Sequence, residues 1–142
     1  MNDGLERLRY EGRELAVVIR SSYHGEGITF FTPSDYSQQL GYMNRPAGHR
    51  IQPHLHKPVR RSVRTTLETL FVRSGRVRIE FFGDDRRRVA ETVVAAGDVI
   101  LLVAGGHALT MLEPSELIEV KQGPYAGDDD KKVFEPLVDE PL

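Results

Sequence analysis

The sequence contains no cysteine, which excludes disulfides, thiolate nucleophiles and metal sites built from cysteine ligands. Long apolar runs are also missing: the longest, residues 99–104, is too short to span a bilayer, and the first residues lack the apolar stretch of a secretory signal. There is no excess of positive charge, because 19 Lys and Arg stand against 21 Asp and Glu, which argues against a dedicated nucleic-acid-binding protein. We therefore expect a cytoplasmic protein that binds neither nucleic acid nor membranes.

The 142 residues are enough for a single domain, 1–142, and 39% hydrophobic with 28% charged residues is typical of a globular chain. Glycine and proline divide the chain into short segments with β-type alternation. In residues 76–81, Val, Ile and Phe share one face and Arg, Arg and Glu share the other. Short strands between polar turns predict an all-β antiparallel sandwich or barrel. The other predicted strands are 15–20, 28–32, 38–44, 50–56, 66–73, 88–94, 98–103, 108–113 and 116–121.

Three segments do not alternate. Residues 3–10 are predicted to form a short helix. Residues 99–103 are apolar throughout, which predicts a strand buried on both faces. The tail from Gly123 onward is polar and acidic, and we expect it to wrap the surface or to fray.

His54 and His56 are two residues apart in a predicted strand, so both imidazoles should project from the same face. Two neutral imidazoles directed at one point form half of a metal site. Gln52 has the same parity and should point the same way. The alternative is that the pair consists of ordinary surface or core histidines.

Two further residues could complete such a site. Glu68 lies among Leu67, Leu70 and other apolar residues, and a carboxylate that enters a core needs a partner to offset its desolvation. His107 follows two glycines directly after the most apolar strand. The alternatives are an edge glutamate that reaches water and a loop histidine bonded to the backbone.

The order and spacing of these residues resemble the two signatures of the cupin superfamily. Gly48, five residues and His54-X-His56, followed later by Glu68, six residues and Gly75, resemble the first. Gly97, five residues, Val103-Ala104-Gly105 and His107 resemble the second. The resemblance implies a jelly-roll of two antiparallel sheets over residues 38–121, between N-terminal extension strands (1–37) and a C-terminal tail (122–142). It also implies one divalent metal ion (Fe, Mn, Ni, Zn or Co), with His54, His56, Glu68 and His107 as its ligands.

Eleven residues separate His56 from Glu68, more than in the family pattern, and we expect them to form a longer loop near the mouth of the barrel. Residues 57–64 carry four positive charges, which suits a carboxylate or phosphate ligand. The alternative is a solvated loop that balances the acidic tail. Gln52, Tyr42 and Arg64 are candidate substrate contacts, and Tyr42 could instead pack in the sandwich.

These expectations predict a metal-dependent enzyme that acts on a small molecule, with dioxygenase, isomerase and lyase chemistry all open. The alternatives are a non-catalytic cupin that binds or senses a small molecule or sugar, and a metal-independent cupin resembling sugar-nucleotide isomerases. Either would need a His–acid pair or an anion pocket instead of four converging ligands. We also expect a homodimer, because small sandwiches leave sheet edges exposed, with residues 15–32 crossing between the subunits.

Overall fold

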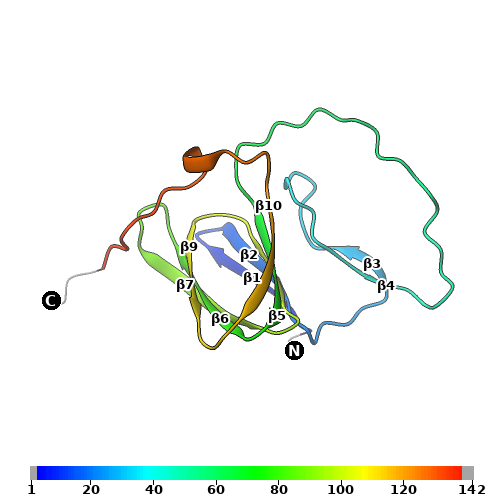
Figure 1. Cartoon of the computed structure of the whole chain (residues 1–142), viewed down its shortest axis with the longest axis horizontal. Helices are drawn as coiled ribbons and strands as arrows, with labels where there is room; N and C mark the ends of the chain where they lie inside the picture. The colour runs from blue at the N-terminus through cyan, green and yellow to red at the C-terminus, as the bar shows by residue number, and fades with distance from the viewer. Residues whose placement is uncertain (1–2, 139–142) are drawn as a thin grey trace.

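The fold was analysed in a computed structural model that describes residues 3–138. Across this range the chain forms ten strands and one short 3-10 helix, η1 (Gly127–Asp129) (Figure 1). The strands are β1 (Leu5–Tyr10), β2 (Arg13–Ile19), β3 (Gly27–Phe30), β4 (Gly41–Asn44), β5 (Glu68–Ser74), β6 (Arg76–Phe82), β7 (Arg88–Ala95), β8 (Val99–Leu102), β9 (Gly106–Met111) and β10 (Glu116–Lys121).

The strands form two main sheets and a separate hairpin. One sheet has the order β1-β2-β8-β5-β10, the other has the order β7-β6-β9, and β3 pairs only with β4. Every pairing between named strands is antiparallel. The prediction of an all-β antiparallel fold is therefore confirmed, although the sheets do not close into a barrel.

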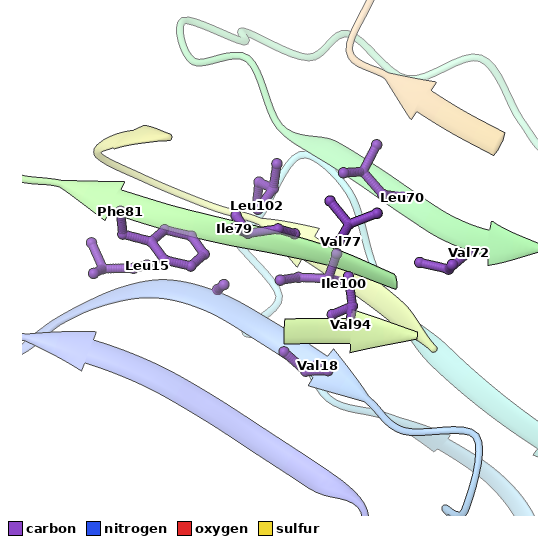
Figure 2. Close-up of a cluster of buried hydrophobic side chains, with 11 residues drawn as sticks. Leu15, Val18, Leu70, Val72, Val77, Ile79, Phe81, Val94, Ile100 and Leu102 are labelled. Atoms are coloured by element: carbon purple, nitrogen blue, oxygen red, sulfur yellow. The ribbon is translucent and has the colours of Figure 1, made fainter. Parts of the chain in front are cut away.

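The main core lies between the two sheets. Alternate residues of each strand point inward, as Val77, Ile79 and Phe81 of β6 do, and these three side chains are fully buried. Figure 2 shows them interleaved with residues of the larger sheet. The cluster consists of Leu15, Ala16, Val18, Leu70, Val72, Val77, Ile79, Phe81, Val94, Ile100 and Leu102.

A second cluster covers the opposite face of the larger sheet. It contains Val17 and Ile19 of β2 and Leu101 of β8, together with Phe31 and Leu67 from outside the strands. The strands β2 and β8 are consequently buried on both faces. The prediction from the unbroken apolar run at residues 99–103 is confirmed on this point.

The predicted helix over residues 3–10 is wrong, because this segment contains strand β1. Leu5 and Leu8 are three residues apart, which imitates helical spacing. In the structure Leu5 packs on the second cluster and Leu8 on the main core, so the two leucines serve opposite faces of a strand. The register shift between Leu8 and Arg9 further disturbs the alternation.

The expectation that residues 15–32 cross between subunits is not supported for their first part. Strand β2 lies between β1 and β8 in its own sheet, and Leu15–Ile19 are buried there. These residues already have partners on both edges and both faces, so they are not free to pair with another chain.

The predicted strand at residues 50–56 is also wrong. Residues 45–66, here called the arm, contain no strand or helix, and all of them are exposed. Figure 1 shows the arm as a wide loop that runs from the β3–β4 hairpin to β5. Alternation gives a segment its two faces, but a strand also needs a neighbouring edge to pair with.

A buried ion pair holds the turn before β8. The Asp98 side chain is only 6% exposed and accepts hydrogen bonds from the backbone N–H groups of Ser21 and Ala95, both at 2.8 Å. Its carboxylate also meets Arg20 Nη1 at 3.1 Å, and Arg20 binds Glu6 at 2.9 Å. Both carboxylates raise the pKa of the Arg20 guanidinium, chiefly through the hydrogen bonds that Arg20 donates to Glu6, against the opposing effect of burial. This network joins β1, β2 and the turn between β7 and β8.

Residues 3–138 contain no helix that is long and apolar enough to cross a membrane.

Candidate functional site

Glu68 and His107 come from different sheets and meet at one end of the sandwich. Glu68 begins β5 and has the inward parity of Leu70, while His107 pairs across β9 and β6 with the buried Phe81. The distance from His107 Nε2 to Glu68 Oε2 is 3.3 Å, and the two side chains are 31% and 17% exposed. The pair is thus partly shielded from water, which strengthens its electrostatic interaction.

Lys121 is the third charged group at this end. It is the cross-strand partner of Glu68 in the pairing of β10 with β5. Its Nζ lies 3.5 Å from Glu68 Oε1 and 3.4 Å from Glu119 Oε1. The charges of Glu119 and then Glu68 raise the pKa of the Lys121 ammonium, so it remains protonated beside the Glu68–His107 pair.

These groups line a pocket of about 710 Å³, here called the main pocket. That volume falls within the range typical of sites for small molecules. Apolar walls and charged groups of both signs surround it. The lining residues are Thr66, Glu68, Leu70, Phe82, Gly105, Gly106, His107, Ala108, Leu109, Glu119, Lys121, Asp130, Lys131, Lys132, Val133, Phe134 and Pro136.

The C-terminal tail forms one wall of the main pocket. The Phe134 ring packs edge to face on Phe82, with 5.5 Å between centroids, and the Arg86 guanidinium lies 5.8 Å from the Phe134 centroid. The Thr66 hydroxyl donates to Asp130 at 2.5 Å. The expectation that the tail wraps the surface is confirmed for these residues, and its course brings lysines to the pocket.

His54 and His56 lie on the exposed arm. Their rings are edge to face, with centroids 5.2 Å apart, and His54 Nδ1 is 2.8 Å from the backbone oxygen of Gln52. The intervening Leu55 is 95% exposed. The structure therefore brings the two imidazoles near each other, but away from the sandwich.

The four residues implied as metal ligands do not converge. Across residues 3–138, no group of three or more His, Cys, Asp or Glu side chains is placed to hold a metal ion. Glu68 and His107 form one pair, and His54 and His56 form another. As placed, these residues fit only half of a four-ligand site.

The three candidate substrate contacts have different surroundings. Tyr42 stacks edge to face on Tyr23, with 4.8 Å between centroids, and packs on the second cluster. This corresponds to the alternative in which Tyr42 packs in the sandwich. Gln52 is an exposed residue of the arm. Arg64 lines a second pocket of about 380 Å³. The second pocket is bounded by Arg13, Glu14, Asp35, Tyr36, Ser37, Ser62, Val63, Arg64, Thr65, Leu67, Val103 and Ala104.

Tyr36 and Glu14 are hydrogen-bonded to each other in the lining of the second pocket. The Tyr36 hydroxyl donates to Glu14 Oε1 at 2.8 Å, and Arg7 Nη1 lies 3.0 Å from Glu14 Oε2. Burial, followed by the hydrogen bond to Glu14, raises the pKa of the Tyr36 phenol to about 12.

This pKa predicts how stability changes in alkali. In the folded protein the Tyr36 phenol keeps its proton above pH 10, whereas in the unfolded chain it loses the proton there. The stabilisation of the fold that follows from this difference is complete below pH 10 and is lost as the pH rises through about 12. The free energy of unfolding should therefore fall more steeply between pH 10 and 12 in the wild type than in Tyr36→Phe. Urea unfolding at a series of pH values measures this difference.

Glu14→Gln is the companion variant. It removes the carboxylate charge that opposes ionisation of Tyr36, so the slope in alkali should become shallower, but less so than in Tyr36→Phe because burial of the phenol remains. Identical slopes in all three proteins would contradict the assignment.

Analysis of the sequence missed Lys121 and the residues of the tail. Lys121 shares the parity of Leu117 in β10, and the strand register pairs it with Glu68. No local signal places Phe134, whose position depends on contacts with β6.

The chemistry of the main pocket therefore provides the basis for assigning a function. It combines an acid, an imidazole and an ammonium group around a space large enough for a small molecule. Comparisons of the chain with protein-family models, curated proteins and solved structures found no match.

Proposed function

We propose that this chain is a cupin-type enzyme that acts on a small molecule in the main pocket, with Glu68 and His107 at the reacting centre. The observation that carries the proposal is the 3.3 Å approach of the two side chains from different sheets inside a pocket. A carboxylate beside an imidazole in a concave pocket is an arrangement that can carry out acid–base catalysis.

The chemistry that the pair supports directly is proton transfer. With a proton on Nε2, His107 faces the Glu68 carboxylate across 3.3 Å, and Nδ1 is left to accept a proton from a bound molecule. The protonated Lys121 beside Glu68 stabilises negative charge that develops nearby. This arrangement matches the His–acid pair of a metal-independent isomerase-like cupin.

A metal-dependent enzyme is the second candidate, and the pattern of the arm favours it. Apart from Pro58, the even-numbered residues 50–64 are polar and include His54, His56 and Arg64, while the odd-numbered residues include four exposed aliphatic side chains. This is the pattern of a half-buried strand. Among residues 3–138, β9 is paired on one side only, so its other edge, next to His107, is available to such a strand.

We propose, for this candidate, that the arm, although it forms no strand in this structure, folds back onto the open edge of β9 and completes a jelly-roll. The two arm histidines would then join Glu68 and His107 as ligands of one divalent ion. Imidazole and carboxylate ligands suit Fe, Mn, Ni, Zn or Co. Such an ion polarises a carbonyl or hydroxyl group or activates water.

The test uses protein purified without an affinity tag and incubated with a metabolite extract, with mass spectrometry to find the compound retained or converted. Glu68→Gln and His107→Ala should each lower turnover at least 100-fold, as expected when an acid–base group is lost. His24→Ala, which removes an exposed histidine elsewhere, should leave turnover unchanged.

Elemental analysis of the same samples separates the two candidates. A stoichiometric divalent metal that disappears in His54→Ala and His56→Ala establishes the metal-dependent enzyme. Full turnover in both of these variants, without metal, establishes the acid–base pair. If Glu68→Gln and His107→Ala both keep wild-type turnover, the reacting centre lies elsewhere.

A further inference from the structure

The charge of the chain is divided unevenly. The arm carries six Lys and Arg and no Asp or Glu, whereas the rest of the chain has 13 basic and 21 acidic residues. A nearly neutral molecule thus contains one strongly cationic segment. Arg64, near the end of the arm, reaches the second pocket.

The second pocket is rich in hydrogen-bond donors. Arg13 and Arg64 contribute guanidinium groups, and two serines and a threonine contribute hydroxyls. Its carboxylates are Asp35 and Glu14, and Glu14 is held by Arg7, by Arg9 and by the Tyr36 hydroxyl.

Arg13 is paired with Asp84 at 3.1 Å. Both side chains are more than half exposed, and an exposed pair of this kind is weak and readily exchanged for another anion. Planar guanidinium groups bind the oxygens of carboxylates and phosphates in pairs. The second pocket therefore has the donor set of an oxyanion site.

A third, smaller pocket shares lining residues with this site and with the reacting centre. It has a volume of about 250 Å³ and shares Arg13 and Thr65 with the second pocket, and Thr66 and His107 with the main pocket. A single molecule could thus occupy the main pocket with one end and reach Arg64 with the other.

We propose that the molecule on which this site acts carries an anionic oxygen group, a carboxylate or a phosphate, which Arg13 and Arg64 hold in the second pocket while the reacting part lies beside Glu68 and His107. This inference rests on the proposed function for the reacting centre, and it adds the chemical class of the substrate and the residues that select it.

The experiment is a calorimetric titration of the full chain with inorganic phosphate, and separately with acetate, at low ionic strength. Arg64→Ala and Arg13→Ala should each weaken binding of the preferred anion tenfold or more. Arg61→Ala is the matched control, because it removes the same charge from the same arm at a position that lines none of the three pockets described. Its affinity should stay within twofold of the wild type.

The outcomes are distinct. Tighter phosphate than acetate binding identifies a phosphorylated substrate, and the reverse identifies a carboxylic acid. An equal loss in Arg61→Ala and Arg64→Ala, or no binding of either anion to the wild type, overturns the inference. Glu68→Gln and His107→Ala should bind the anion as the wild type does. A failure of anion binding would therefore not contradict the assignment of Glu68 and His107 to the reacting centre.

Discussion

Replacing Asp98 with alanine should lower the free energy of unfolding by about 3 kcal/mol or more. The substitution removes the acceptor of two backbone N–H groups and one of the two carboxylates on Arg20. Each buried donor left without a partner costs roughly 1–3 kcal/mol, and a charge that loses its buried partner adds to this. Urea unfolding followed by circular dichroism measures the loss.

Glu6→Ala is the matched control for this prediction. It removes the other carboxylate from Arg20, but Glu6 is 31% exposed at its side chain, against 6% for Asp98. Partly exposed ion pairs contribute at most about 1 kcal/mol. Equal losses in the two variants would show that Asp98 acts only as one charge among several.

Gly75→Ala should destabilise the fold by about 3 kcal/mol through two separate effects. Gly75 has φ +89°, a conformation that alanine adopts only with strain. A Cβ at this position would also lie 2.2 Å from Ser115 Oγ and 2.4 Å from the backbone oxygen of Pro114. The neighbouring turn would have to move, since a backbone oxygen cannot rotate away as a side chain can.

Gly12→Ala separates the two effects. Gly12 has φ +75°, but a Cβ there would have no heavy atom within 4 Å. It should therefore show only the backbone strain, about 1 kcal/mol. Chemical denaturation of both variants measures the difference, and equal losses would contradict the predicted steric clash.

Local pattern was sufficient to predict most strands and failed where a strand depends on distant partners. The alternation of residues 76–81 predicted β6, because its apolar face lies between two sheets. Residues 50–56 alternate equally well, yet they pair with nothing in residues 3–138. Whether an edge is available to a segment is a property of the whole fold and is absent from any short stretch of sequence.

The same distinction between local pattern and distant partners applies to the candidate site. Glu68 was singled out because a carboxylate among apolar residues needs a partner, and His107 because it follows a buried strand; the structure places them 3.3 Å apart. Their proposed role as metal ligands together with His54 and His56 remains a prediction. Lys121 lies beside Glu68 because of the register in which β10 pairs with β5. The tail lies at the pocket because Phe134 packs on Phe82. Neither arrangement can be deduced from spacing.

The central position of β2 has a consequence for how the molecule forms. Ala16 pairs with Leu102, 86 residues further along the chain, so this sheet cannot assemble until most of the polypeptide has been made. The entropy of closing so large a loop is lost before the contacts between β2 and β8 can stabilise the sheet. Topologies of this kind typically fold slowly. Until β8 arrives, the apolar faces of the first hairpin stay open to water and to other nascent chains. This topology therefore favours producing the protein at low temperature or together with chaperones.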